Sequence, residues 1–192
     1  VYRGRHFPTT VARFSMVFGP NNGIIDREQR MFARLLQGRK ILIPGRGTTL
    51  SQIGHVDDQA RALRMMALNP RTYGEIYNVT GKDYFSDEGY VDTCAKVVGV
   101  EPQKVFVPDD IMDESSSETR RPLIQRLAPY IHRWDESTVF GIAKLCDHLG
   151  YEPFYTFNTA VQQTYEWFMA EDLDKKREYD FSIEDELINR IG

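Results

Sequence analysis

The stretch KILIPGRG at residues 40–47, followed by HVDD at residues 55–58, decides the predicted fold of this chain. The apolar run at residues 41–43 predicts a short buried strand, and the proline and glycines after it predict a turn. A second short strand is expected to end at Ile53 and to lead into a helix. Asp58, or Asp57 beside it, is expected to accept hydrogen bonds from the first helical turn, and its charge favours the positive end of the helix.

The helix after HVDD carries an apolar stripe. Val56, Ala60, Leu63 and Ala67 recur at helical spacing, so we expect this face to be buried. The apolar run at residues 76–79 follows as another strand. A strand that leads into a capped helix and then into a further strand is typical of an α/β fold with a parallel sheet.

Similar patterns predict the remaining elements. Phe32, Leu35 and Leu36 are expected to pack inward from a helix that Asp26 caps and Gly38 closes. The other expected elements are strands at residues 10–14 (buried on both faces), 104–108 and 137–140, helices that begin at Ser86, Gly141 and Thr159, an aperiodic acidic loop at residues 109–133, and a docking strand with a short acidic helix at residues 179–188.

Charge is distributed unevenly along the chain. Residues 1–71 carry 12 Lys and Arg against 4 Asp and Glu, whereas residues 72–192 carry 12 against 24. Arg27, Arg30 and Arg34 belong to the basic part and are expected to face solvent from their helix. A basic front half favours anionic partners such as phosphates, nucleotides or nucleic acid, unless the two halves neutralise each other in the fold.

Length and composition narrow the class of protein. The 192 residues, 41% of them hydrophobic, suffice for one sizeable core with a satellite lobe. No apolar run approaches the ~18–20 residues that span a bilayer, so no membrane partner is expected. Cys94 and Cys146 are expected to be small reduced core residues, and the 4 histidines lack metal-ligand spacing, so no metal site is predicted. Because the chain opens at Val1 without an initiator Met, we expect it to begin inside a longer unit.

An ordered series of short motifs resembles one family over nearly the whole chain. The motifs are RFSMVFGP at residues 13–20, IPG at 43–45, HVDD at 55–58, YNV at 77–79, LGYEP at 149–153 and TYEWF at 164–168. In this order they resemble the C-terminal half of an extended short-chain dehydrogenase/reductase, which belongs to the NAD-dependent epimerase/dehydratase family.

The resemblance implies an α/β fold with the C-terminal part of a Rossmann-type parallel sheet and a small α+β substrate lobe. Residues 1–80 would supply late strands and helices of the dinucleotide-binding domain with part of the substrate lobe. Residues 81–192 would form the C-terminal substrate-binding lobe. The whole chain would be one truncated unit that lacks the N-terminal cofactor half.

The resemblance also implies site residues, which are Phe18, Gly19 and Pro20 for the cofactor, and Met16, Asn21, Arg46, Ser51 and Gln52 for the substrate. Two positions depart from the family pattern. The family usually has Asn where this chain has Met16, and an Arg that clamps the substrate pyrophosphate where it has Ser51. A hydroxyl cannot replace a bidentate guanidinium, so an ordinary nucleotide sugar is an unexpected substrate unless another arginine substitutes.

The family's catalytic machinery is not recognisable in this sequence. Gly45 and Gly47 follow a strand but open no helix, and the third glycine of a dinucleotide-binding turn is missing. No tyrosine has a lysine four residues later, as the family's Tyr-x-x-x-Lys pair requires. We therefore predict no catalytic residue and an inactive fragment.

The same resemblance implies the ligands of the full-length protein. NAD or NADP would be held by upstream residues, and this chain would bind neither tightly. The substrate would be a sugar-nucleotide-like or other small polar or phosphorylated molecule. A homodimer is expected.

A narrower resemblance supports an alternative function. PGRG at residues 44–47, LSQIGHV at 50–56 and YDFSIEDEL at 179–187 are similar to the chloroplast stem-loop-binding proteins and their bacterial relatives. These atypical members of the superfamily generally lack its usual active site, and the plant proteins bind RNA. The alternative is a non-catalytic RNA-binding protein. With either function the protein is expected in the cytoplasm or, in a plant, in the chloroplast stroma. Against the RNA-binding alternative, the sequence shows no aromatic platform interleaved with the basic residues, as single-strand binding would favour.

Overall fold

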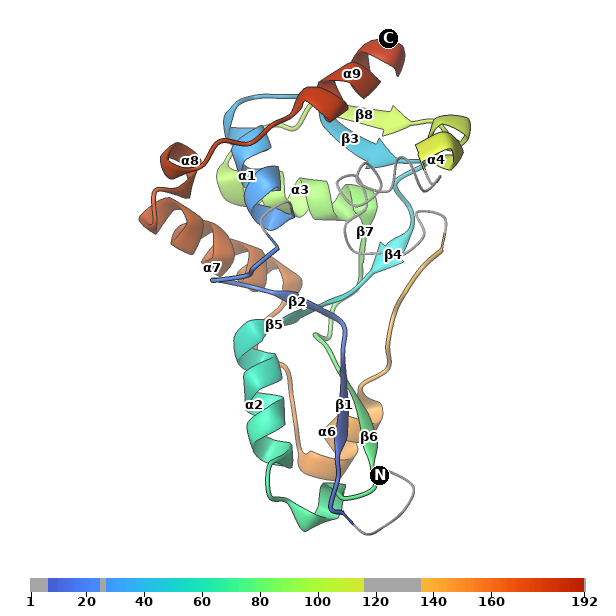
Figure 1. Ribbon diagram of the computed structural model, residues 1–192, viewed down its shortest axis with the longest axis vertical. Coiled ribbons are helices and arrows are strands. Elements are labelled where there is room, and N and C mark those ends of the chain that lie inside the picture. Colours follow the sequence, from blue (N-terminus) through green and yellow to red (C-terminus); the bar gives the residue numbers. More distant parts are fainter. Residues whose placement is uncertain (1–6, 25–26, 116–135, 192) are drawn as a thin grey trace.

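The computed structural model describes residues 7–24, 27–115 and 136–191, which form a mixed α/β fold. Figure 1 shows an elongated molecule with two lobes that are joined where β2 and β5 run together. The strands are β1 (Val11–Phe14), β2 (Met16–Phe18), β3 (Ile41–Pro44), β4 (Leu50–Ser51), β5 (Ile53–His55), β6 (Ile76–Val79), β7 (Phe85–Ser86) and β8 (Lys104–Val107). The helices are α1 (Glu28–Leu36), α2 (Val56–Met66), the 3-10 turn η2 (Pro70–Thr72), α3 (Asp87–Val98), α4 (Asp109–Ser115), α6 (Ala143–Leu149), α7 (Phe157–Ala170), α8 (Leu173–Lys176) and α9 (Ser182–Ile191).

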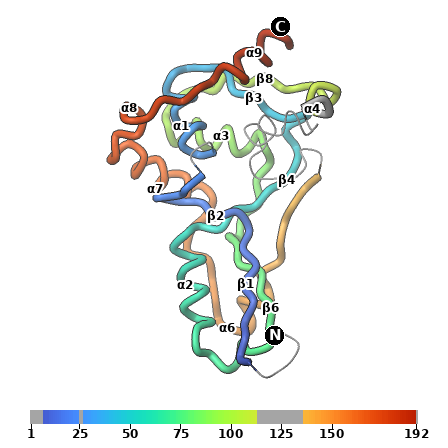
Figure 2. Tube along the Cα trace, in the orientation of Figure 1, coloured from blue at the N-terminus to red at the C-terminus, as the bar shows by residue number. Residues whose placement is uncertain are grey.

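The chain passes between the two lobes repeatedly, as the tube in Figure 2 shows. The lower lobe takes β1, α2 and β6 from the first half of the chain and α6 from the second. The upper lobe takes α1 and β3 from residues 1–80 and α3, α7 and α9 from residues 81–192. Each lobe is therefore built from both halves, and the division at residue 80 stays a prediction.

The lower lobe contains the predicted parallel strand pair. β1 lies parallel to β6, with Val11 opposite Ile76 and Phe14 opposite Val79. The α/β fold with parallel pairing is confirmed. β1 is not buried on both faces, since Arg13 and Phe14 are exposed, because β6 is its one strand neighbour among the described residues. Helices α2 and α6 pack on this pair, and the shared core contains Ala62, Met66, Tyr77, Val79, Leu145 and Tyr151.

Helix α2 differs from the prediction in its cap and in its buried face. His55 caps it, since the Nδ1 atom of His55 accepts a hydrogen bond from the Asp57 N–H at 3.2 Å. The buried face contains Asp58 and Met66, whereas most of the predicted stripe faces outward and Leu63 is 46% exposed. The predicted face is wrong because the Asp58 carboxylate binds backbone N–H groups of a segment far away in the sequence.

Three arginines at the N-cap of α1 and within it are buried, although the sequence predicted that they face solvent. Arg27, Arg30 and Arg34 are 3–4% exposed. Arg30 forms a bidentate pair with Glu184 of α9, with Nε–Oε1 at 2.7 Å and Nη2–Oε2 at 2.8 Å. Arg34 pairs with Asp185 of the same helix at 3.4 Å. The acidic end of the chain therefore neutralises part of the basic front half.

Phe181 anchors the segment that leads into α9. Its side chain is 4% exposed, and the guanidinium groups of Arg30, Arg34 and Arg39 lie 4.7, 5.1 and 5.0 Å from its ring centroid. The predicted docking strand at residues 179–181 is not a strand. The docking itself is made by this aromatic ring and the ion pairs around it, and the predicted acidic helix is confirmed as α9.

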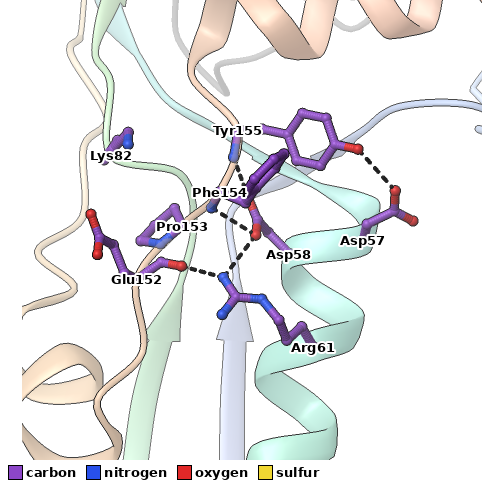
Figure 3. Close-up of a pocket in the computed structure, with 8 residues that line it drawn as sticks. All are labelled: Asp57, Asp58, Arg61, Lys82, Glu152, Pro153, Phe154 and Tyr155. Carbon is purple, nitrogen blue, oxygen red and sulfur yellow. Dashed lines mark hydrogen bonds and ion pairs between the residues drawn. The ribbon is translucent and has the colours of Figure 1, made fainter.

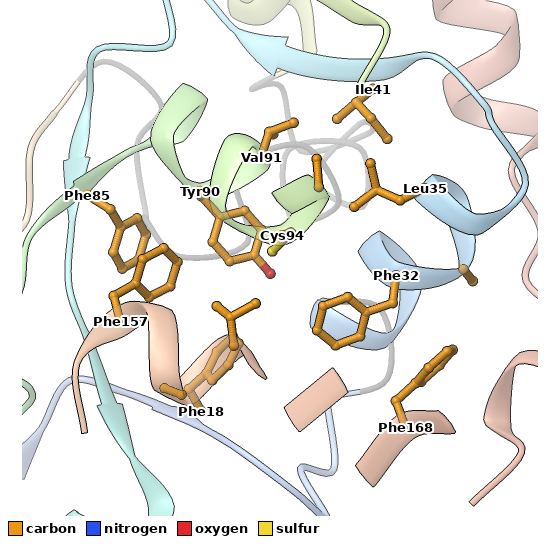
Figure 4. Packing of buried hydrophobic residues seen from close by; sticks show 14 of the residues in the cluster. Phe18, Phe32, Leu35, Ile41, Phe85, Tyr90, Val91, Cys94, Phe157 and Phe168 are labelled. Carbon is orange, nitrogen blue, oxygen red and sulfur yellow. The ribbon is translucent and has the colours of Figure 1, made fainter. Parts of the chain in front are cut away.

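The upper lobe has an aromatic core, which Figure 4 shows from close by. The rings of Phe85 and Phe157 stack with their centroids 4.0 Å apart, and Phe18 contacts Phe157 edge-on at 6.4 Å. This core attaches β2 to α7. Cys94 is fully buried in it and Cys146 is half-buried in the lower lobe, and both are free thiols, as predicted.

Four further predictions need correction or remain open. Residues 137–140 are not a strand, although one backbone hydrogen bond joins them to β4. Thr156 caps α7, and Thr159 is the other half of a capping box at the third helical position. Helix α4 forms the start of the predicted acidic loop, whereas the rest of that loop and the predicted cap Asp26 lie outside the described residues.

Candidate functional site

The turn Phe18–Gly19–Pro20 lies where the two lobes meet. β2 runs parallel to β5, with Phe18 opposite His55. Gly19 has φ +134°, and a Cβ atom there would lie 2.8 Å from Val56 Cγ1 and 3.1 Å from His55 Nε2. A side chain would therefore clash with the start of α2, and only glycine fits. The residues predicted to contact a cofactor are held in one closely packed turn.

His55 is the buried polar residue beneath this turn. It is 2% exposed, and its ring stacks on Tyr155 with the centroids 3.7 Å apart. Burial lowers the pKa of His55, against the opposing effect of the Asp57 carboxylate. Because Nδ1 accepts the Asp57 N–H, the neutral ring carries its proton on Nε2, the atom that faces Gly19.

The residues predicted to contact a substrate occupy different environments. Met16 lies opposite Ile53 at the start of β2 and is half-buried. Asn21 is exposed and has φ 60°, in the left-handed region. Arg46 is exposed in the turn after β3, in the upper lobe. The structure thus places Met16 and Asn21 beside the Phe18 turn and puts Arg46 on a separate turn.

Ser51 and Gln52 lie inside the protein. Ser51 is 1% exposed on β4, and its hydroxyl has no hydrogen-bond partner among the described residues. The Gln52 amide donates to the Gly81 carbonyl at 2.7 Å, and its oxygen accepts from the Phe140 N–H at 2.8 Å. Gln52 therefore ties two distant backbone segments to the connection between β4 and β5. The substrate roles of both residues stay predictions.

Asp87 is a buried acid that the sequence did not single out. It lies at the start of α3, and its N–H donates to the Thr49 carbonyl at 3.1 Å, beside the pairing of Ser51 with Phe85. The side chain is buried, and its Oδ2 atom has no hydrogen-bond partner in the part of the chain that the structure describes. Burial raises the pKa of Asp87 to about 7. In the sequence it reads only as an acidic residue in a first helical turn.

A hollow of about 660 Å³ opens beside the first turn of α2, and we call it the α2 hollow (Figure 3). The sequence analysis did not predict it, because its walls come from three separate segments. Its lining residues are Asp57, Asp58, Arg61, Lys82, Glu152, Pro153, Phe154 and Tyr155.

The buried carboxylate of Asp58 holds the inner wall of the α2 hollow together. It accepts hydrogen bonds from the Phe154 and Tyr155 N–H groups, both at 2.9 Å, and from Arg61 at 3.0 Å. Arg61 also donates to the Glu152 carbonyl (Figure 3). The segment after LGYEP is therefore fixed to α2 by a charge-assisted network.

Two further properties bear on the kind of site. Within residues 7–24, 27–115 and 136–191, no group of three or more His, Cys, Asp or Glu side chains could hold a metal ion. None of the helices in the described part combines the length and the apolar character that crossing a membrane requires.

Sequence comparison relates the chain to longer proteins. Residues 1–80 match the NAD dependent epimerase/dehydratase family. The chain is 27% identical over 175 residues to the chloroplast stem-loop binding protein of 41 kDa b from Arabidopsis thaliana, which covers 91% of this chain and 43% of that protein. It is 24% identical over 163 residues to the dTDP-glucose 4,6-dehydratase of Salmonella typhimurium, which covers 85% of this chain and 41% of that enzyme. The chain thus spans less than half the length of these two relatives.

Comparison with solved structures identifies the fold. UDP-glucuronic acid 4-epimerase from Bacillus cereus, in complex with UDP-glucuronic acid and NAD, has a TM-score of 0.67 at 18% identity, over 88% of this chain and 48% of that one. dTDP-glucose 4,6-dehydratase from Bacillus anthracis, in complex with NAD, has a TM-score of 0.64 at 21% identity, over 85% of this chain and 45% of that one. The predicted Rossmann-type α/β fold is confirmed.

Proposed function

We propose that this chain belongs to the NAD-dependent epimerase/dehydratase family and is the substrate-binding C-terminal portion of an enzyme that acts on a sugar-nucleotide-like or other small polar substrate. β1 and β6 would be late strands of the dinucleotide-binding sheet, and residues 81–192 would supply most of the substrate lobe. Residues outside this chain would hold most of the NAD or NADP. The chain alone would then neither bind the dinucleotide tightly nor turn over a substrate.

The position of the Phe18–Gly19–Pro20 turn is the observation that carries this proposal. In open α/β sheets, ligands bind beyond the carboxyl ends of parallel strands. β1 ends at Phe14 and leads directly through β2 to this turn, at the junction of the two lobes. A ligand that lies there can contact both lobes.

The environment of Ser51 restricts the chemical class of the proposed substrate. The hydroxyl of Ser51 and the carboxyl of Asp87 are both buried, and the two residues lie on neighbouring positions of the β4–β7 pairing and the start of α3. A diphosphate placed here would meet a buried carboxyl group, and no arginine of the described residues bonds to the Ser51 hydroxyl or the Asp87 Oδ2 atom, which is unfavourable for a dianion. This supports a substrate whose contacts at Ser51 are made by hydroxyl or amide groups.

An NMR titration of the isotope-labelled chain tests the proposal. UDP-glucuronic acid and free glucuronic acid, each at millimolar concentration, should shift the amide signals of residues 16–21 and 51–55. At residues 51–55, free glucuronic acid should shift the amide signals at least as strongly as UDP-glucuronic acid does. NAD should shift residues 18–20 only weakly. Shifts confined to other residues, or none with either sugar, would contradict the proposed substrate site.

RNA binding remains the second candidate function, favoured by the Arabidopsis thaliana relative, whose name describes stem-loop binding. The burial of Arg27, Arg30 and Arg34 weakens it, because these arginines account for part of the positive charge of the front half. A filter-binding titration with a stem-loop RNA at increasing salt distinguishes the two functions, since phosphate contacts make affinity fall steeply with salt. Salt-sensitive saturable binding would favour the RNA-binding alternative.

A further inference from the structure

The α2 hollow is a candidate binding site that neither the family nor the proposed function accounts for. Its volume of about 660 Å³ lies within the ~300–1,000 Å³ of ordinary small-molecule pockets. It is lined by the first turn of α2, by Lys82 after β6 and by residues 152–155. It is therefore larger than a metal ion or a single ammonium ion needs.

The inner wall of the α2 hollow is rigid and electrically neutral. The carboxylate of Asp58 is 3% exposed and pairs with Arg61, so their charges compensate each other. Both oxygens of Asp58 also accept backbone N–H groups. Arg61 lies over the ring of Tyr151, with its guanidinium 4.8 Å from the ring centroid. The polar atoms of Asp58 and Arg61 are therefore already bonded within the protein. A ligand would be recognised by the groups at the outer edge of the α2 hollow.

The outer groups are two carboxylates, one ammonium group and one exposed aromatic ring. Asp57 has a side chain that is 64% exposed, although its carboxylate also accepts a hydrogen bond from the Tyr155 hydroxyl at 3.4 Å, and Phe154 is 77% exposed. Glu152 and Lys82 are exposed, and neither forms an ion pair with another residue in the described ranges. In Figure 3 the carboxylates of Glu152 and Asp57 lie on opposite sides of Phe154. The five charged lining residues, three acidic and two basic, sum to −1.

We propose that the α2 hollow binds a small organic cation, with an ammonium or guanidinium group against Phe154 and the carboxylates of Glu152 and Asp57. The face of an aromatic ring attracts a cation, and two carboxylates beside it complement the charge. An organic cation also covers the exposed ring with its hydrocarbon part, which an inorganic cation cannot do. Lys82 opposes the cation by repulsion and limits the affinity.

Isothermal titration calorimetry with three probes tests the proposal. Agmatine carries both a guanidinium and an ammonium group, Mg²⁺ is an inorganic cation, and inorganic phosphate reports an anion site at Lys82. Agmatine is expected to bind saturably and to bind more tightly than Mg²⁺. Saturable phosphate binding that Lys82→Gln abolishes would overturn the proposal, and so would the absence of saturable agmatine binding.

Variants connect the binding to the named groups. Phe154→Ala should weaken agmatine binding about two- to five-fold, as expected for an exposed cation–π contact. Glu152→Gln should weaken it by a similar factor, about two- to five-fold. Lys82→Gln should strengthen it, because a repulsive charge is removed.

Matched control variants separate this site from general surface charge. Phe7→Ala removes another exposed phenylalanine, and Glu178→Gln removes another exposed carboxylate. Neither should change agmatine binding. Equal losses in the control variants, or an unchanged affinity in Phe154→Ala, would show that the cation binds to the acidic surface at large and would overturn the proposal. The variants are all at exposed positions, so circular dichroism should show an intact fold.

Discussion

The substitution Asp87→Asn should stabilise the protein, and more so as the pH rises. Asp87 has a pKa of about 7 in the fold, against an ordinary value of 3.8. Between these two values the unfolded chain carries a charged carboxylate, whereas the folded chain must keep it neutral. The unfolded state therefore binds fewer protons, and the free energy of unfolding falls by ~1.4 kcal/mol for each pH unit. The loss begins above the ordinary pKa and is complete above the pKa in the fold.

The expected size of the effect follows from this window. Over roughly three pH units the loss comes to ~4 kcal/mol at most. The positive end of α3 favours a charged carboxylate by up to about 1 kcal/mol, so the loss should lie below this upper limit. Asn has a similar shape and does not ionise, and the variant should lack this part of the pH dependence.

Urea denaturation of both proteins between about pH 5 and pH 8 measures the effect. The variant should already be the more stable of the two at about pH 5, and its advantage should grow by roughly 2–3 kcal/mol by about pH 8. Asp147→Asn is the control, because that carboxylate is exposed on α6. Curves for Asp87→Asn and the original chain that run parallel across this range would refute the reasoning, since burial would then not impede the ionisation of Asp87.

Three other substitutions should destabilise the chain, as measured by urea denaturation. Glu184→Gln removes the partner charge of buried Arg30 and should cost about 3–5 kcal/mol. Gly19→Ala places a methyl group against Val56 in a positive-φ turn and should cost more than about 2 kcal/mol. Asp58→Ala leaves two backbone N–H groups without their acceptor and should cost about 2–4 kcal/mol.

Each of these substitutions has a matched control. Glu186→Gln changes an exposed glutamate on α9 and should have almost no effect. Gly99→Ala also replaces a glycine with positive φ, 82°, but meets nothing within 4 Å, so only Gly19→Ala should add a clash. Asp57→Ala removes the neighbouring exposed aspartate and should cost under about 1 kcal/mol. Losses as large in the controls as in the test variants would contradict these assignments.

The sequence by itself determined the local elements and the fold class of this protein. Apolar runs bounded by turn residues predicted β3, β6 and β8, and the parallel pairing followed from the strand–helix–strand order. Ser86 caps α3 as predicted, and Gly99 and Gly150 end their helices with positive φ. These features depend on backbone conformation and on hydrogen bonds between near neighbours, which the residue types themselves impose.

Only the tertiary structure decided which faces of α1 and α2 are buried. It also decided where the α2 hollow forms and that the carboxyl group of Asp87 is buried. Helical spacing placed Arg30 on the outer face of α1, yet its partner Glu184 is 154 residues away. The Asp58 carboxylate is buried because it accepts hydrogen bonds from N–H groups that are 96 and 97 residues away. A polar side chain is buried when a distant segment completes its hydrogen bonds, because the pairing then offsets the loss of water. Periodicity within one helix carries no information about such a partner.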